Sequence, residues 1–337
     1  MVLLPCARAS DAVELRIYTW EYFLDPQVLA EFGRRHGVKV RLAYFKSDWE
    51  RDLRLSAGNR ADFDVAVVDA AQVAVYQARG WLEPISVERV PGLAHVDPTW
   101  RSVTGAIAAH ALPFGWGTLG IAYRADFVKE TPDSWAALFQ PAASLCGKVL
   151  AGDDPRELIA IALKATGHSA NATDPADYQD AQRLLQEQRR CVLGYRYTGM
   201  EPQSDLPTGK AWAAMAYSSD AAWLRALNPN IRFVVPREGG LIWADYLVVL
   251  SSSPRKSLSF QFLEFLCEPA IAARMALYSR TATPNARARA LLPAAVRQDV
   301  SIYPPSESLR NSELIGVAPP AVMSLRNQIF ARIVRSN

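Results

Sequence analysis

The sequence lacks the long apolar run that a membrane-spanning helix requires. Such a helix needs about 18 or more consecutive apolar residues, and no stretch of this 337-residue chain reaches that length. Half of the residues are hydrophobic, as in ordinary globular proteins. The chain is too long for one comfortable hydrophobic core, so we expect a globular protein with two lobes.

An excess of one charge is also lacking. The net charge is only +3, and the arginines are scattered apart from short pairs such as Arg34-Arg35 and Arg189-Arg190. A nucleic-acid-binding protein would gather its basic residues into a stripe or patch. We therefore expect no nucleic-acid partner.

Catalytic and metal-binding signatures are missing as well. The sequence contains no phosphate-binding glycine loop, no dinucleotide-binding glycine motif, no H-E-x-x-H helix and no G-x-S-x-G elbow. The four histidines, His36, His95, His110 and His168, do not have metal-ligand spacing. We expect no catalytic residues, no cofactor and no metal ion.

Cysteine is scarce, and none of it has C-x-x-C spacing. The four positions are Cys6, Cys146, Cys191 and Cys267. If Cys6 is removed on export, the remaining three allow at most one disulfide. Sequence spacing does not determine connectivity, but Cys146–Cys191 is the pair that we expect.

The first 12 residues resemble the tail of a secretory signal. A few apolar residues precede Ala7-Arg8-Ala9, which has the A-x-A cleavage pattern, while the charged start of a signal is missing. Either the start codon is placed too late or the sequence is truncated. A lipid anchor at Cys6 is the alternative, although Leu3-Leu4-Pro5 before it is a poor lipidation motif. We expect an exported, periplasmic protein.

The sequence does contain a pattern of short strands that alternate with helices. Asp25-Pro26 starts a helix that Gly37 ends, and alternating or continuous apolar residues flank it. This order favours an open α/β sheet. The first expected elements are strand 14–20, helix 27–36, strand 38–42, helix 50–56 and strand 63–68.

A glycine-rich segment at 112–120 interrupts this alternation of strands and helices. Glycines 115, 117 and 120 surround Trp116, which fits either a crossing between lobes near a ligand or an ordinary turn. A second α/β region follows. Its expected elements are strands 148–151, 212–217 and 231–235, helices after Pro155 and at 177–189, a crossing at 241–250, and helices at 254–278 and 319–333.

Acidic residues stand beside aromatic ones at the ends of expected strands or crossings, where open α/β sheets bind ligands. The four places are Trp20-Glu21-Tyr22, Asp153 to Glu157, Tyr217 to Asp220, and Trp243-Ala244-Asp245-Tyr246. Each also has a structural explanation, because Asp153 or Asp154 and Asp220 would cap helices, with Glu157 completing a capping box.

Together these residues suit an organic cation. Carboxylates accept charge-assisted hydrogen bonds from ammonium groups, and aromatic faces cover methylene chains and attract cations. A metal ion is the alternative for an acidic cluster, but it would favour oxygen ligands without tryptophan walls.

The chain resembles the bacterial periplasmic spermidine- and putrescine-binding proteins, the polyamine branch of the type 2 solute-binding fold. The resemblance runs over nearly the whole chain from about residue 14. The motifs that carry it are Ile17-Tyr18-Thr19-Trp20, Phe63 to Val68, Pro113 to Thr118, Asp133-Ser134-Trp135, Asp153 to Glu157, Pro236 to Gly240, Trp243-Ala244-Asp245, Thr283-Pro284-Asn285 and Ile302-Tyr303-Pro304-Pro305.

This resemblance implies an α/β, two-lobed periplasmic binding protein, each lobe an open mixed sheet flanked by helices, with the ligand in the cleft between lobes. We expect lobe 1 at 13–118 plus 246–296 and lobe 2 at 119–245 plus 297–337. It also implies a monomer that captures a polyamine such as putrescine or spermidine for the permease subunits of an ABC importer.

The resemblance assigns roles where this sequence matches. Trp20 corresponds to an aromatic wall, Asp220 to a carboxylate ligand beside Tyr217, and Trp243 with Asp245 to an aromatic and acidic pair. Asp154 and Glu157 correspond to acids that receive an ammonium group. The complete predicted site is Trp20, Glu21, Tyr22, Asp69, Trp116, Asp154, Glu157, Tyr217, Asp220, Trp243 and Asp245.

Several positions depart from the family pattern. Glu21 replaces a serine or threonine, Tyr22 an acid, Asp69-Ala70 a Pro-Ser pair and Thr281 a tyrosine, while Trp212 stands where the partner of Cys146 usually lies. The preferred amine therefore stays open, and another cationic or zwitterionic amine is an alternative.

A sensor that passes its closed form to a membrane signalling protein is the alternative function. Gene neighbours encoding an ATPase and permeases would favour transport, and a neighbouring membrane kinase or cyclic-dinucleotide enzyme would favour signalling. An enzyme on the same scaffold is a third hypothesis, which turnover of an amine would support.

Overall fold

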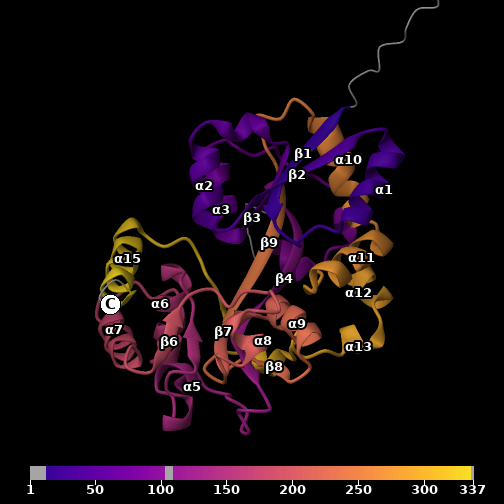
Figure 1. The fold of residues 1–337 in the computed structure, drawn as a ribbon. Helices are drawn as coiled ribbons and strands as arrows, with labels where there is room; N and C mark the ends of the chain where they lie inside the picture. The colour runs from indigo at the N-terminus through magenta and orange to yellow at the C-terminus, as the bar shows by residue number, and fades with distance from the viewer. Residues whose placement is uncertain (1–12, 103–108, 335–337) are drawn as a thin grey trace, which may run out of the picture. The chain divides into compact units, whose positions relative to one another are not determined.

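The computed structural model describes residues 13–102 and 109–334, so the expected signal tail at 1–12 lies outside the described residues. The chain divides into two compact units (Figure 1). Unit 1 comprises Met1–Phe114, Asp245–Ser279 and Thr283–Leu291, and unit 2 comprises Gly115–Ala244, Arg280–Ala282 and Leu292–Asn337.

These boundaries differ by several residues from the lobes expected from the sequence. The chain changes unit within β4 (Leu112–Arg124) and within β9 (Leu241–Val249). Both strands are continuous at the division, so the hydrophobic pattern has no break there. The glycine-rich segment 112–120 is part of β4 rather than a turn.

Unit 1 is built from strands and helices that alternate along the first part of the chain and from helices of a later part. Its elements are β1 (Glu14–Trp20), α1 (Pro26–His36), β2 (Lys39–Phe45), α2 (Asp48–Ser56), β3 (Val65–Asp69), α3 (Ala70–Ala78), α4 (Pro98–Ser102), the second half of β9, α10 (Lys256–Cys267), α11 (Pro269–Ser279) and α12 (Ala286–Leu291).

Helix α1 forms where local signals predict it. Asp25 accepts a hydrogen bond from the Gln27 N–H at 2.8 Å, Pro26 occupies the first turn, and Gly37 ends the helix with a φ of 66°. A left-handed φ is inexpensive only for glycine. The capping prediction for this helix is confirmed.

The sheet of unit 1 has the strand order β2-β1-β3-β9. Strands β1, β2 and β3 are parallel, whereas β9 runs antiparallel to β3 and places Asp245 opposite Asp69. Helices α2 and α3 begin just after β2 and β3 end. The parallel strands therefore bring their carboxyl ends, and the helix starts that follow, to one edge of this sheet.

Unit 2 has a second sheet region flanked by helices. Its elements are β4 from Gly115, α5 (Ala136–Phe139), β5 (Val149–Ala151), α6 (Pro155–Ala165), α7 (Asp177–Gln188), β6 (Val192–Tyr195), α8 (Asp205–Thr208), β7 (Ala213–Tyr217), α9 (Ser218–Leu227), β8 (Ile231–Val234), the first half of β9, α13 (Ala294–Arg297), α14 (Ser306–Leu309), β10 (Glu313–Leu314) and α15 (Pro320–Val334).

The strands of unit 2 follow the order β4-β7-β5-β6, and β8 pairs with β4. Helix α6 packs against α7 and α15, and Trp135 is fully buried in the core. The expected disulfide Cys146–Cys191 is present in this unit. Cys267 of unit 1 is a buried free thiol.

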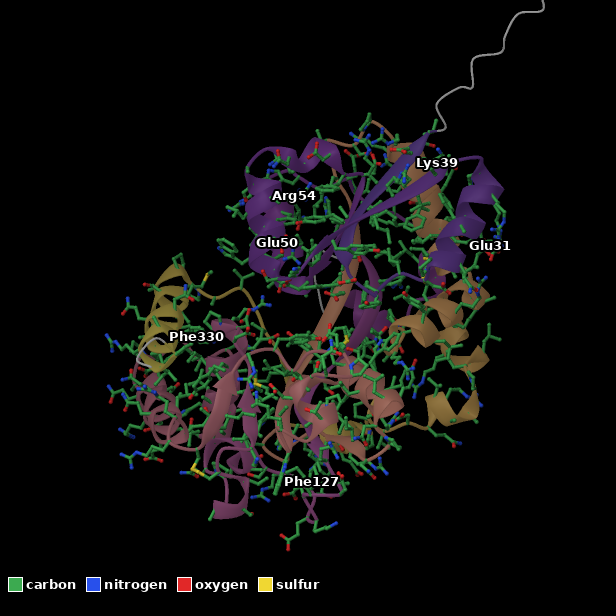
Figure 2. All side chains as sticks on the ribbon, viewed as in Figure 1. Glu31, Lys39, Glu50, Arg54, Phe127 and Phe330 are labelled. Atoms are coloured by element: carbon green, nitrogen blue, oxygen red, sulfur yellow. A yellow bond between two sulfur atoms is a disulfide. The ribbon has the colours of Figure 1, made fainter. Side chains whose placement is uncertain are left out.

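Charged side chains such as Glu31 on α1 and Arg54 on α2 lie on the outside of unit 1 (Figure 2). Arg54 also covers the rings of Tyr18 and Phe63, at 5.4 and 4.9 Å from their centroids. Within the described ranges, none of the helices combines the length and the apolar character needed to cross a membrane.

Candidate functional site

Asp245 of unit 1 is a partly buried carboxyl in an acidic setting. Burial, then the nearby Asp48 and Asp69 carboxylates, raise its pKa to about 8, while Arg51 and a hydrogen bond from the Trp20 side chain lower it. Asp245 and Asp69 oppose each other in the β3–β9 register, which places their side chains on the same face of the sheet. The structure therefore brings together three of the predicted site residues: Trp20, Asp69 and Asp245.

Asp69 is held by neighbours within its own unit. Its Oδ1 accepts hydrogen bonds from the backbone N–H of Ala71 at 2.9 Å and of Gln72 at 3.1 Å, which caps α3. Its Oδ2 lies 3.4 Å from Nη2 of Arg51. Asp69 thus starts a helix and partners a buried cation at the position predicted to contact ligand.

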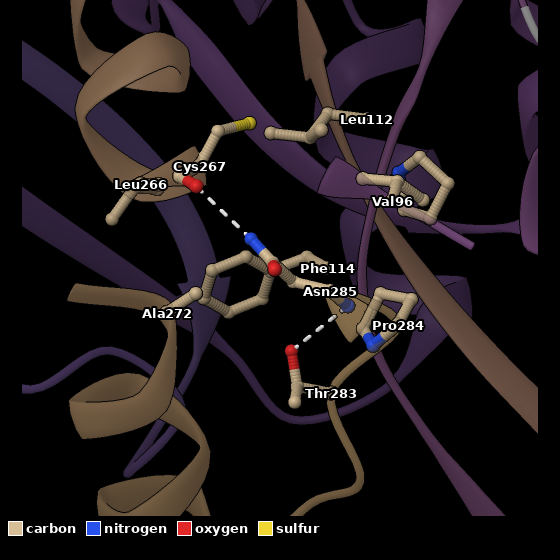
Figure 3. A pocket seen from close by; sticks show the side chains of 10 residues that line it. Val96, Leu112, Phe114, Leu266, Cys267, Ala272, Thr283, Pro284 and Asn285 are labelled. Atoms are coloured by element: carbon tan, nitrogen blue, oxygen red, sulfur yellow. Dashed lines mark hydrogen bonds between the residues drawn. The ribbon is translucent and has the colours of Figure 1, made fainter. Parts of the chain in front are cut away.

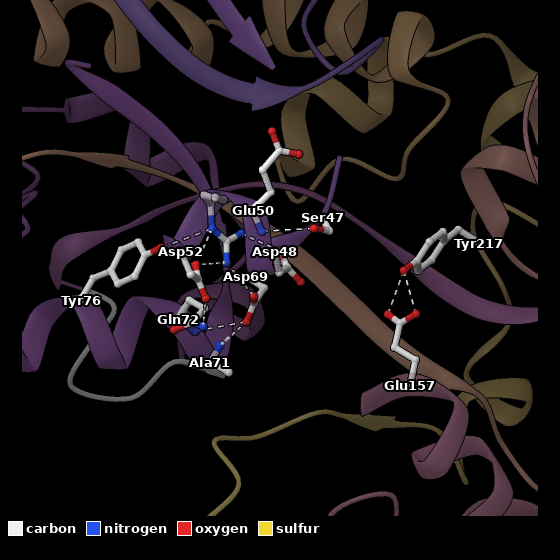
Figure 4. A network of polar contacts seen from close by, with 11 residues as sticks. Ser47, Asp48, Glu50, Asp52, Asp69, Ala71, Gln72, Tyr76, Glu157 and Tyr217 are labelled. Atoms are coloured by element: carbon white, nitrogen blue, oxygen red, sulfur yellow. Dashed lines mark hydrogen bonds and ion pairs between the residues drawn. The ribbon is translucent and has the colours of Figure 1, made fainter. Parts of the chain in front are cut away.

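Arg51, Asp48 and Asp52 also belong to this region, although they are not among the residues predicted from the sequence. The Arg51 side chain is fully buried, and its guanidinium contacts Asp48 at 2.7 Å and Asp52 at 2.9 Å in addition to Asp69. Figure 4 shows these carboxylates converging on one point. The i,i+3 spacing of Asp48 and Arg51 does predict a pair, but such pairs usually lie on the surface of a helix, so the sequence has no signal for burial.

The three residues after β1 have different environments. Trp20 is partly buried, and its ring meets Phe45 edge to face with centroids 4.3 Å apart. Glu21 is exposed, and Tyr22 is 49% exposed and has a φ of 58°. A positive φ is uncommon for a bulky residue and marks a strained turn. Of this group, Trp20 is the residue next to the acidic cluster, which consists of Asp48, Asp52, Asp69 and Asp245.

Asp220 of unit 2 is the second buried acid. It lies in the first turn of α9 and accepts hydrogen bonds from the hydroxyls of Tyr197 at 2.7 Å and Ser219 at 3.3 Å. Burial raises its pKa to about 6, and these two hydrogen bonds oppose the shift. The expectation that Asp220 caps α9 is wrong, because this helix has no side-chain cap.

Tyr197 is not among the residues predicted from the sequence. It lies in the loop after β6, and the residue is 46% exposed although its hydroxyl reaches Asp220. Burial of the hydroxyl and the Asp220 charge raise the pKa of Tyr197. A loop tyrosine separated from its partner by 23 positions leaves no periodic signal.

The acidic pair at the start of α6 has divided roles. Asp154 caps the helix by accepting from the N–H groups of Arg156 at 2.7 Å and Glu157 at 3.0 Å, as its structural explanation predicted. The Glu157 carboxylate accepts a hydrogen bond from the Tyr217 hydroxyl, with oxygen distances of 2.8 and 2.9 Å (Figure 4). Two predicted site residues of unit 2, Glu157 and Tyr217, are thus in direct contact.

Trp243 lies beside this pair, edge to face with Tyr217 at a centroid distance of 6.3 Å. Its ring also lies against Gly117, where an added Cβ would be 2.5 Å from Cζ2 of Trp243 and 2.5 Å from Oγ of Ser218. Any side chain at Gly117 would therefore displace Trp243. This glycine of the 112–120 segment is needed for close packing.

Trp116 packs against other parts of unit 2. It is 9% exposed, meets Tyr303 edge to face at 6.2 Å, and exchanges backbone hydrogen bonds with Ala282. Its described contacts link two segments of unit 2. They place its ring against Tyr303, a member of another motif of the resemblance.

Other motifs of the resemblance are also structural. The Trp135 indole donates to the carbonyl of Gly239 at 2.8 Å, which joins two of them in unit 2. In unit 1, the Asn285 amide donates to the carbonyl of Cys267 at 2.9 Å, and its Oδ1 accepts the N–H of Ala288 at the start of α12. Figure 3 shows Asn285 in a small pocket lined mostly by apolar side chains.

The class of protein follows from comparison with known families. Residues 27–303 match the family described as bacterial extracellular solute-binding protein. The chain is 32% identical over 336 residues to a norspermidine sensor of Vibrio cholerae, covering 99% of this chain and 92% of that protein. The chain belongs to this family of extracellular solute-binding proteins.

Two further relatives define the branch and the fold. The spermidine/putrescine-binding periplasmic protein of Escherichia coli is 27% identical, with 92% of this chain and 88% of that protein covered. The crystal structure of a spermidine/putrescine ABC transporter substrate-binding protein of Streptococcus pneumoniae superposes with a TM-score of 0.85 at 23% identity, covering 96% and 98% of the two chains. The expected family and the two-lobed periplasmic binding protein fold are confirmed.

Proposed function

We propose that this protein binds a small organic polycation of the polyamine type in the periplasm and delivers it, as a monomer without catalytic activity, to an ABC importer. The names of the Escherichia coli and Streptococcus pneumoniae relatives support this assignment. The chain's own residues support it independently, because Asp220 is buried and Asp245 partly buried, and each lies beside an aromatic side chain.

The observation that carries the proposal is the state of Asp220 and Asp245. Burial raises the pKa of both carboxyl groups, to about 6 for Asp220 and to about 8 for Asp245. Within the described ranges, neither forms an ion pair with lysine or arginine within 4.0 Å. A buried carboxylate without a cation is costly, and an alkylammonium ion would supply the missing charge together with strong hydrogen bonds.

Each unit also holds aromatic groups that could contact an amine. In unit 1, Trp20 hydrogen-bonds to Asp245 and offers ring surface. In unit 2, Tyr197 holds Asp220, and Tyr217 and Trp243 lie in edge contact. Ring faces attract organic cations by about 0.5–2 kcal/mol per contact and cover the methylene chain that joins them. This composition favours an amine over a metal ion.

Calorimetric titration with putrescine, cadaverine, norspermidine, spermidine, spermine and agmatine tests the proposal. Removing one partner of a buried charge pair costs about 2–5 kcal/mol, so Asp245→Asn should weaken the best amine at least about 30-fold. Asp220→Asn should act in the same direction. Matched controls are Asp62→Asn in unit 1 and Glu307→Gln in unit 2, both exposed, which should leave affinity unchanged.

The stoichiometry tests whether both acids serve one ligand. If they do, one amine binds per chain, and each single variant lowers affinity while the stoichiometry stays at one. Two amines per chain, reduced to one in either variant, would show separate sites. Wild-type protein that binds none of the amines would refute the proposed function.

A sensor is the second candidate, favoured by the similarity to the norspermidine sensor. The amine-binding residues would be the same, so the ligand panel does not separate the two functions. Reconstituted permease and ATPase subunits should take up labelled amine only with this protein if it serves transport. Amine-dependent binding to a membrane signalling protein, with no uptake, would establish the sensor instead.

A further inference from the structure

The buried guanidinium of Arg51 makes the acidic cluster of unit 1 unusual. A fully buried arginine inserted among carboxylates already provides one cation at this edge of the sheet. Burial alone would lower the pKa of Arg51, but the charges of Asp48, Asp69 and Asp52 raise it. The group is therefore a permanent positive charge.

The neighbours of Arg51 fix it in place. Its Nε donates to Asp52 at 3.0 Å and lies 3.4 Å from the Tyr76 hydroxyl. The Tyr76 hydroxyl itself donates to Asp52 at 2.5 Å, and the Gln72 amide donates to the other oxygen of Asp52. Such a network resists rearrangement, so we expect Arg51 to keep these contacts when a ligand binds.

Asp69 and Asp245 differ in their contact with Arg51. They oppose each other across β3 and β9, and two neighbouring carboxylates could each accept one ammonium group. Arg51 lies 3.4 Å from Asp69, whereas Asp245 has no cationic partner within 4.0 Å among the residues that the structure describes.

We infer that Arg51 is a specificity-determining residue: its guanidinium contacts Asp69, so that unit 1 accepts a single ammonium group at Asp245 and an additional charge on the amine does not strengthen binding. The inference rests on the proposed function. In chemical terms, Arg51 supplies the positive charge that a second ammonium group of the ligand would otherwise supply. The protein should therefore discriminate poorly between a diamine and a triamine of similar reach.

The test removes the guanidinium together with one of its carboxylates. Arg51→Gln with Asp52→Asn keeps the local charge balance, since one positive and one negative group are lost, and frees Asp69 for a ligand. The ratio of the Kd for cadaverine to the Kd for norspermidine should rise about tenfold relative to wild type. Asp52→Asn alone retains Arg51 and should leave the ratio at its wild-type value.

A second variant keeps the test decisive if the double variant does not fold. Asp69→Asn removes a carboxylate that contacts Arg51, and it should weaken amine binding at least about tenfold less than Asp245→Asn does. An equal loss would mean that Asp69 itself receives an ammonium, and it would overturn the inference. An unchanged amine ratio in a folded Arg51→Gln, Asp52→Asn protein would overturn it as well.

These outcomes are distinct from failure of the proposed function. If wild-type protein binds amines but the cadaverine-to-norspermidine Kd ratio is unchanged when Arg51 is replaced, only the specificity role of Arg51 is wrong. If wild-type protein binds no amine, the proposed function is wrong and with it the inference. Circular dichroism of each variant verifies the fold in either case.

Discussion

The two units raise the pKa of a buried acid by different means. Asp245 of unit 1 is surrounded by like charges, Asp48 and Asp69, which add to the effect of burial. Asp220 of unit 2 is surrounded by the hydroxyls of Tyr197 and Ser219, which oppose burial. The resulting pKa values are about 8 and about 6. In both acids burial raises the pKa, while the neighbouring carboxylates add to the shift at Asp245 and the neighbouring hydroxyls oppose it at Asp220.

The largest effect should follow from removing the cation of unit 1. Arg51→Met leaves three partly buried carboxylates, Asp48, Asp52 and Asp69, without their cation, and breaking a buried pair costs about 3–5 kcal/mol. Urea unfolding followed by circular dichroism measures this loss. Arg183→Met is the matched control in unit 2, because Arg183 is 67% exposed in its pair with Asp180 and exposed pairs contribute little. If the two variants were equally stable, Arg51 would contribute no more to stability than an exposed ion pair does.

The pH dependence of amine binding should separate the two acids. An ammonium ligand needs ionised carboxylates, so affinity should fall as the pH drops from about 8, where Asp245 becomes protonated, by up to about tenfold per pH unit. Titrations between pH 5.5 and 8.5 measure it. Asp245→Asn should abolish the dependence above pH 7 and leave the part near pH 6 that belongs to Asp220. A flat wild-type profile would contradict both pKa values.

The same acid should give the unliganded protein an unusual stability profile. The pKa of Asp245 is about 8 in the folded state against an ordinary value of 3.8, so the folded state binds more protons between these values. By linkage, this contribution to stability is present at low pH and is lost as the pH rises toward 8. The difference between wild-type and Asp245→Asn melting temperatures should therefore change with pH. A constant difference would argue against the shift.

The smallest effect should come from the hydroxyl of unit 2. Tyr197→Phe removes one hydrogen bond to Asp220, which is worth about 1.5–3 kcal/mol to a charged acceptor. The pKa of Asp220 should then rise above 6, and the lower step of the amine-binding profile should move to higher pH. Tyr195→Phe is the control, since its hydroxyl contacts Gln188 instead.

Local signals in the sequence predict much of this fold. Asp25, Pro26 and Gly37 delimit α1 as expected, and the alternating segments become strands close to their predicted bounds. These features depend on residues near one another in the chain. The disulfide partner of Cys146 was also anticipated.

The candidate site was harder to predict because its details depend on distant residues. The helix capping of Asp154 follows from its neighbours, but the contact of Tyr197 with Asp220 and the burial of Arg51 are tertiary. The segment around Arg51 is as polar as any surface helix, and Trp49 beside it is 72% exposed. No periodicity tells which charged residue of such a helix turns inward.

The disulfide between Cys146 and Cys191 bears on how the protein is produced. Cysteine pairs form disulfides in oxidising compartments, whereas in the bacterial cytosol they remain reduced thiols. Material made in a reducing host would therefore carry two extra thiols in unit 2, reactive toward maleimide once unfolded. Mass spectrometry after alkylation distinguishes the two preparations before any amine is titrated.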